Sequence, residues 1–213
     1  MAFLIKPKQT VVFIGDSITD CGRRGDRAPL GDGYVKLAND LITARYPAHR
    51  LNINTGIGGN TVRDLAGRWH DDVVRHKPDV LSIKIGINDL FSWLNKDPDR
   101  SVSPQEFTEI YDRVLDRTRR QTKAGVVLVD PFFISTERDR STHRGKVLEH
   151  LPAYIRTVHA MAKKYRARLV RTHEQFQALL KNYPPDHFCP EPVHPYTTGH
   201  MVIAHAWLKT MGW

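Results

Sequence analysis

Apolar runs alternate with stretches of helical periodicity along the whole chain. The run TVVFIG (10–15) is continuously apolar, which is typical of a strand covered on both faces. In the next stretch, GYVKLANDLITARY (33–46), apolar residues recur at helical spacing and end before Pro47. The alternation predicts strands over 10–15, 50–55, 79–87, 126–130 and 168–172, and helices over 33–46, 61–77, 103–123, 146–165, 174–182 and 197–212.

This order of elements predicts the fold. Strands that alternate with helices form a parallel sheet with right-handed crossovers and helices on both faces. Five strands in this pattern favour the flavodoxin-like order 2-1-3-4-5. The 213 residues contain no internal repeat, low-complexity segment or interdomain linker. We therefore expect a single domain over 1–213, an α/β protein built as a three-layer α/β/α sandwich.

Charge and composition exclude some classes of protein. Thirty-two Lys and Arg against 23 Asp and Glu leave a formal charge of +9, which raises the question of nucleic-acid binding. The basic residues are scattered, and no zinc-finger spacing or aromatic-rich RNA-binding signature accompanies them, so we interpret them as solvated surface. No apolar run approaches the roughly 20 residues needed to span a membrane. The N-terminus lacks the pattern of a secretory signal, so we expect a cytoplasmic protein with no nucleic-acid or membrane partner.

Candidate chemistry follows the predicted strands. Ser17 follows the first strand, a glycine-rich turn (56–61) follows the second, and Asn88 follows the third. His194 lies shortly before the last helix. Ligands of open parallel sheets bind beyond the carboxyl ends of the strands, so these groups are expected to meet at one rim. A nucleophile, oxyanion donors and a general base are the parts that acyl transfer requires.

Four sequence blocks carry a family resemblance. GDSIT, GIGGNT, GINDL and the VHP near the C-terminus resemble the blocks of the SGNH hydrolases, also called GDSL esterases. They occur in family order and together span residues 13–195. More closely, FIGDSITDCGR, GNTVRDL followed by RW, SIKIGIND, and VHP followed by GHM are similar to bacterial acetyl xylan esterases.

The resemblance implies a role for each matching residue. Ser17 matches the nucleophile, and its own backbone N–H would supply one oxyanion donor. Gly59 matches the backbone donor of the second block, and Asn88 matches the side-chain donor of the third. His194 matches the general base. No cofactor or metal is implied.

One position departs from the family pattern. The family usually has an Asp three residues before the catalytic histidine, and here Glu191 occupies that place. We predict that Glu191 orients His194. Asp186, eight residues before His194, stays open as the alternative.

Other polar residues are expected to have structural roles. Both cysteines are expected to be free thiols. The remaining residues fall into three groups: Asp16 and Asp89, which fix their loops by hydrogen bonds; Arg63 and Arg68, which brace the glycine-rich turn; and His200 and His205, which pack or lie at the surface.

We therefore predict a serine esterase that removes acetyl groups from small carbohydrate esters, such as acetylated xylo-oligosaccharides, through an acetyl-enzyme. Alternatives are a thioesterase or lysophospholipase of the same superfamily, or a catalytically weakened carbohydrate-binding module. Trp69, Phe91 and Trp93 fit a sugar-stacking wall and core packing equally well. The expected partner is a small acetylated carbohydrate, and the sequence also allows a homo-oligomer.

Overall fold

The computed structural model describes residues 3–46, 48–49 and 53–213. Its five strands form one parallel sheet in the order β2-β1-β3-β4-β5, which confirms the flavodoxin-like prediction. Positions 50–52 of the strand expected over 50–55 lie outside the described residues. The strands are β1 (Val11–Gly15), β2 (Ile53–Asn54), β3 (Val80–Lys84), β4 (Gly125–Val129) and β5 (Arg168–Val170).

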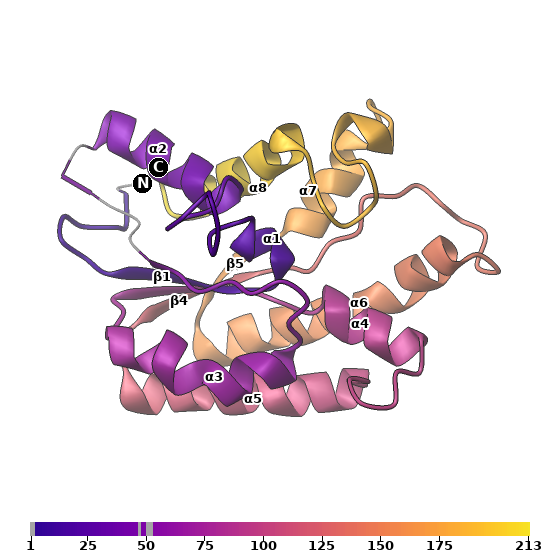
Figure 1. Cartoon of the computed structure of the whole chain (residues 1–213), viewed down its shortest axis with the longest axis horizontal. Coiled ribbons are helices and arrows are strands. Elements are labelled where there is room, and N and C mark those ends of the chain that lie inside the picture. Colours follow the sequence, from indigo (N-terminus) through magenta and orange to yellow (C-terminus); the bar gives the residue numbers. More distant parts are fainter. Residues whose placement is uncertain (1–2, 47, 50–52) are drawn as a thin grey trace.

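Helices cover both faces of the sheet, as Figure 1 shows. One face carries α1 (Ser17–Asp20), α2 (Tyr34–Arg45), α7 (Thr172–Leu179) and α8 (Thr197–Thr210), with α8 packed against both α2 and α7. The other face carries α3 (Val62–Asp72), α4 (Ile87–Leu94), α5 (Pro104–Gln121) and α6 (His143–Tyr165). Within the described ranges, no helix combines the length and apolar character needed to cross a membrane.

Local sequence signals explain where several helices begin. Thr61 and Asp64 form a capping box at the start of α3, in which each side chain binds the backbone N–H of the other residue. Ser103 accepts the Glu106 N–H at 3.2 Å, and Pro104 occupies the first position of α5. These caps agree with the predicted starts at 61 and 103.

Other boundaries differ from the sequence prediction. The strand expected over 79–87 ends at Lys84, because Gly86 has a φ of +130° and turns the chain into the unpredicted helix α4. The helix expected over 61–77 ends at Asp72 and continues as the short 3₁₀ helix η1 (Val74–His76). Helix α6 begins at His143 rather than 146, because Thr142 caps it by accepting the Gly145 N–H at 3.0 Å.

A buried ion pair joins β3 to the end of β1. The Lys84 side chain is 1% exposed and that of Asp16 is fully buried, with Lys84 Nζ 3.4 Å from Asp16 Oδ2. The ammonium also lies over the Phe132 ring, 4.8 Å from its centroid. Burial lowers the pKa of Lys84, and the Asp16 carboxylate opposes that shift. Each charge therefore depends on the other to remain in the core.

Replacing Lys84 by Met should lower the free energy of unfolding by roughly 3–5 kcal/mol, because the Asp16 carboxylate would stay buried without its counter-ion. Urea unfolding followed by circular dichroism measures the change. The double variant Lys84→Met/Asp16→Asn removes both charges and should recover most of the loss. A double variant as unstable as the single one would contradict this account.

Candidate active site

Ser17 lies at the junction of β1 and α1, where the backbone turns within a very confined space. A Cβ atom at Gly15 would lie 2.4 Å from the Lys84 carbonyl oxygen, so this turn accepts no side chain there. The Asp16 carboxylate caps α1 by accepting the Ile18 N–H at 3.0 Å. Ser17 is therefore the first residue of a helix at the carboxyl edge of the sheet.

Ser17, His194 and Glu191 form a continuous chain of hydrogen bonds. Ser17 Oγ lies 2.9 Å from His194 Nε2, and the Glu191 carboxylate binds His194 Nδ1 on the other side of the ring. Because a carboxylate only accepts hydrogen bonds, Nδ1 carries the proton and Nε2 accepts from the serine hydroxyl. This is the arrangement by which a histidine activates a serine nucleophile.

The longer side chain of Glu191 folds back onto its own loop. Its Oε1 accepts the His194 backbone N–H at 2.7 Å, and its Oε2 accepts the Val193 N–H at 3.0 Å. The Pro192 carbonyl accepts the Ile134 N–H at 2.9 Å, which ties this loop to the segment after β4. Asp186 lies in the 3₁₀ helix η2 (Pro185–His187) and, among the described residues, makes no contact with the imidazole.

The glycine-rich turn and the start of α1 each have one backbone N–H group that is without an acceptor in the described part of the chain. Gly59 has a φ of +79°, which a glycine adopts without strain. The neighbouring N–H groups are used: that of Gly58 donates to Asp20 Oδ2 at 2.9 Å, and that of Asn60 to the Ile57 carbonyl at 3.3 Å. Among the described residues, the N–H groups of Ser17 and Gly59 have no acceptor.

The Asn88 amide points toward the same turn. One of its N–H bonds donates to the Asn60 carbonyl at 3.0 Å, which leaves the second for a ligand. Asn88 is the second residue of α4, so it does not cap this helix. The adjacent Asp89 accepts the Val62 N–H at 2.8 Å and thereby joins α4 to α3. Burial raises the pKa of Asp89 to about 7.

Arginines brace the glycine-rich turn. Arg68 donates to the Thr55 carbonyl at 2.6 Å, the Asn60 side chain at 2.8 Å and the Gly15 carbonyl at 3.2 Å, as expected of it. The same expectation for Arg63 is wrong. Arg63 instead donates to Glu106 and to the carbonyls of residues 99 and 101, because α5 and the loop before it pack beside α3 and supply these acceptors.

Three residues near the turn were not singled out by sequence reasoning. Arg24 donates to Asp20 Oδ2 at 2.7 Å, and this carboxylate oxygen also holds the Gly58 N–H. Arg100 donates to the Gly59 carbonyl. The sequence signal for the first of these contacts was Asp20 itself, a charged residue that directly follows the apolar strand and the GDSIT block. The partner of Arg100 lies 41 positions away and leaves no local pattern.

Of the two roles left open for Trp69, a sugar-stacking wall and core packing, the structure shows core packing. It is fully buried, and its Nε1 donates to Thr118 Oγ1 at 3.1 Å. Phe91 and Trp93 are half-buried on α4. Phe91 packs edge-on against Phe133, with ring centroids 6.2 Å apart.

Cys21 and Cys189 are both free thiols. Cys21 donates to Asp32 Oδ1 at 3.2 Å and lies 3.4 Å from Nε2 of His200. Burial raises the pKa of Cys21 to about 12 and lowers that of His200 to about 4, so this group pairs a neutral thiol with a neutral imidazole at pH 7. His200 packs in the interior and His205 is exposed. In the described part of the chain, no three His, Cys, Asp or Glu side chains form a group that could hold a metal ion.

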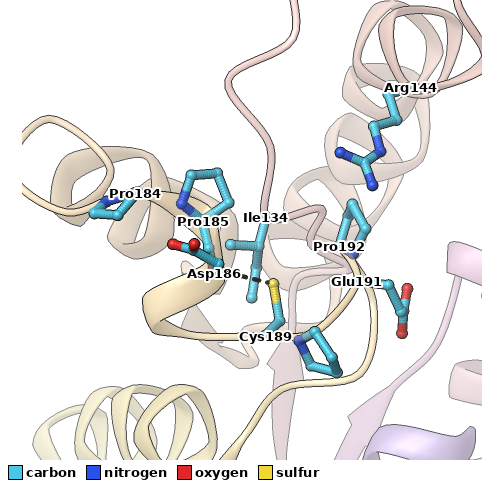
Figure 2. A pocket seen from close by; sticks show the side chains of 9 residues that line it. Ile134, Arg144, Pro184, Pro185, Asp186, Cys189, Glu191 and Pro192 are labelled. Atoms are coloured by element: carbon cyan, nitrogen blue, oxygen red, sulfur yellow. Dashed lines mark hydrogen bonds between the residues drawn. The ribbon is translucent and has the colours of Figure 1, made fainter.

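A pocket of about 280 Å³ lies beside Glu191 (Figure 2). Its walls come from the segments 184–186 and 189–192, from Ile134, and from Arg144 at the start of α6. The pocket thus borders the loop that carries His194.

Comparison with known proteins agrees with this geometry. The model of the GDSL-like lipase/acylhydrolase family matches residues 13–202. An acetylxylan esterase of Geobacillus stearothermophilus is 36% identical over 213 residues, which cover 96% of this chain and 94% of the relative.

Solved structures show the same similarity. The crystal structure of Axe2, an acetylxylan esterase from Geobacillus stearothermophilus, matches with a TM-score of 0.88 and 35% identity over 99% of this chain and 97% of that one. LAE5, an α/β hydrolase from the metagenome of Lake Arreo, matches with a TM-score of 0.88 and 35% identity over 99% and 98%. These findings confirm the resemblance of the four sequence blocks. The chain therefore belongs to the GDSL-like lipase/acylhydrolase family, and it is a carboxylic ester hydrolase.

Proposed function

We propose that the protein is a serine esterase that removes acetyl groups from small carbohydrate esters, such as acetylated xylo-oligosaccharides. The hydrogen-bond chain from Ser17 through His194 to Glu191 carries this proposal, because it supplies a nucleophile, its base and a group that orients the base. The similarity to acetylxylan esterases over nearly the whole chain supports the choice of substrate.

In the first half-reaction, Ser17 Oγ attacks the ester carbonyl carbon while His194 Nε2 takes the hydroxyl proton. The carbonyl oxygen becomes an oxyanion and accepts hydrogen bonds from the Ser17 and Gly59 N–H groups and the free N–H of Asn88. Collapse of this intermediate breaks the bond to the sugar oxygen. His194 returns its proton to that oxygen, so the sugar leaves as an alcohol and acetyl remains on Ser17.

In the second half-reaction, water attacks the acetyl carbonyl while His194 accepts one of its protons. The same three donors receive the oxyanion. When the bond to Ser17 Oγ breaks, His194 returns the proton to that oxygen, which releases acetate and restores the free serine. One imidazole thus serves both halves of the cycle.

Glu191 keeps the imidazole in the required tautomer and stabilises the imidazolium that forms in each half-reaction. Axe2 supports this role: its structures include catalytic mutants in which a serine, an aspartate or a histidine is replaced by alanine, and that aspartate lies three residues before that histidine. Glu191 has the same spacing to His194.

The alternative functions differ in what they need from the site. A thioesterase or lysophospholipase would use the same three catalytic residues on another substrate. A weakened binding module would have lost the orienting carboxylate, whereas Glu191 is in contact with His194. The cytoplasmic location and the homo-oligomer stay predictions.

A substrate panel tests the proposed function. The enzyme should cleave acetyl esters faster than octanoyl esters or acyl-thioesters and gain rate when the alcohol is a sugar, because remote sugar contacts stabilise the transition state. Ser17→Ala should lose several orders of magnitude in turnover and form no acetyl adduct by intact-protein mass spectrometry. Faster octanoyl or thioester hydrolysis would move the assignment to lysophospholipase or thioesterase. Near-parental turnover by Ser17→Ala would rule out the mechanism.

The oxyanion role of Asn88 predicts a specific kinetic change. Asn88→Ala should lower kcat by roughly a hundred- to a thousand-fold with little change in KM, as expected for the loss of one oxyanion donor. Steady-state kinetics with 4-nitrophenyl acetate measure both constants. A change confined to KM would instead indicate that Asn88 binds the ground state.

A matched pair of neutral variants tests whether Glu191 or Asp186 orients His194. Glu191→Gln keeps the side-chain size but removes the charge, so kcat for 4-nitrophenyl acetate should fall at least about a hundred-fold at pH 7. Asp186→Asn should change kcat less than about two-fold, because Asp186 does not reach the imidazole. The reverse pattern would assign the orienting role to Asp186, and no effect of either would indicate a Ser–His dyad.

A further inference from the structure

The central peptide of the glycine-rich turn has no hydrogen bond of its own. Residues 57–60 form a β-turn, closed by the Asn60 N–H, which donates to the Ile57 carbonyl at 3.3 Å. Gly59 has a φ of +79°, as at the third position of a type II turn. In the described part of the chain, the Gly58 carbonyl has no donor and the Gly59 N–H has no acceptor. The direction of the Gly59 N–H, a proposed oxyanion donor, therefore depends on the peptide groups on either side of it.

Contacts with two other parts of the chain hold these flanking groups. The Gly58 N–H donates to Asp20 of α1 at 2.9 Å. The Gly59 carbonyl accepts from Arg100, which lies in the loop between α4 and α5. Two consecutive glycines give the turn many possible backbone conformations, so each contact removes freedom that the turn would otherwise have. Arg100 makes its contact at residue 59 itself.

The loop that carries Arg100 is itself anchored by hydrogen bonds. Asp97 Oδ1 accepts the N–H groups of Asp99 and Arg100, both at 3.0 Å. Arg63 of α3 donates to the carbonyls of residues 99 and 101. The Arg100 guanidinium therefore reaches the turn from a backbone that is held in place.

Arg100 has a looser counter-ion than Arg68, which also holds the turn. Arg68 forms a direct hydrogen bond with Asp72. Arg100 Nη2 lies 3.9 Å from Asp64 Oδ2, beyond hydrogen-bond distance, and the Arg100 side chain is 52% exposed. A cation that is only weakly paired and lies beside Gly59 favours negative charge that develops at this turn.

We propose that Arg100 is a positioning residue for the reaction: by holding the Gly59 carbonyl, it keeps the Gly59 N–H directed at the oxyanion, and its charge stabilises that anion. The inference rests on the proposed function and deepens it. Arg100 acts through the backbone of Gly59 and not on the substrate groups that bind before the reaction. Its loss therefore raises the energy of the transition state more than that of the bound substrate, which lowers kcat and leaves KM unchanged.

Variants at position 100 test this role. Arg100→Ala should lower kcat for 4-nitrophenyl acetate roughly ten-fold with little change in KM, the loss expected for one hydrogen bond from a charged donor. The oxyanion forms in both half-reactions, so kcat falls whichever of them limits the rate. Arg100→Met keeps an unbranched side chain without a donor and should behave in the same way, which excludes lost packing as the cause. Arg100→Lys supplies a charged donor to the same single carbonyl, so its kcat should stay within about three-fold of the parent value.

Arg63→Ala is the matched control. It removes the bonds to the carbonyls of residues 99 and 101 in the same loop but no contact with the turn, so kcat should change less than about two-fold.

Trifluoroacetone supplies a second measurement. Its carbonyl carbon forms a bond to Ser17 Oγ and its oxygen becomes an anion, while His194 takes the hydroxyl proton. The inhibition constant should rise in Arg100→Ala by about the factor by which kcat falls, because the adduct resembles the transition state. Arg63→Ala should keep the parental inhibition constant.

The outcomes separate the inference from the function on which it rests. If the parent enzyme hydrolyses 4-nitrophenyl acetate and Arg100→Ala keeps its kcat, or if Arg63→Ala loses as much, the positioning role is overturned and the esterase function stands. A rise in KM with kcat and the inhibition constant unchanged would make Arg100 a ground-state substrate contact and also overturn the role. If the parent enzyme hydrolyses no acetyl ester, the proposed function is overturned, and the positioning role with it.

Discussion

The ion pair between Lys84 and Asp16 holds the turn that follows β1 against β3, the central strand of the sheet. Asp16 uses its carboxylate twice, toward the Lys84 ammonium and as the cap of the helix that begins with Ser17. Such a pair contributes little net stability over an apolar packing of the same shape, because both charges are stripped of water. The pair instead fixes the position of Asp16, because its carboxylate cannot turn away from the core without leaving the buried Lys84 ammonium without a counter-ion. The position of Ser17, the proposed nucleophile, thus depends on the contact with β3.

From this fixed point, hydrogen bonds connect the other parts of the site. Asp20, one turn along α1, holds the Gly58 N–H, and Asp89 holds the start of α3 from α4. Arg68 reaches the carbonyls at the ends of both β1 and β2. The proposed oxyanion donors therefore belong to one connected network, and such preorganised donors need little reorganisation when charge develops on a substrate.

The sequence predicted the order of strands and the residues at the rim, because each candidate follows a strand and parallel strands end at one edge. It could not predict distant partners that belong to none of the four sequence blocks' expected roles. Lys84 and Asp16 are 68 positions apart, and Arg63 finds Glu106 across 43. Helix α4 was missed because the apolar run continues past Lys84, and only the backbone conformation of Gly86 ends the strand. Periodicity records burial, and the strand and the first residues of α4, with Ile87 and Leu90, both present buried apolar side chains.

The bonds that Glu191 makes within its own loop have a consequence for how this active site can change during evolution. The carboxylate holds the imidazole and also the backbone N–H groups of Val193 and His194, so residues 191–194 form one hydrogen-bonded unit. Insertions or deletions upstream of this unit would move both groups together and preserve their mutual geometry. The loop between α7 and Glu191 can thus change in length without altering the contact between Glu191 and His194.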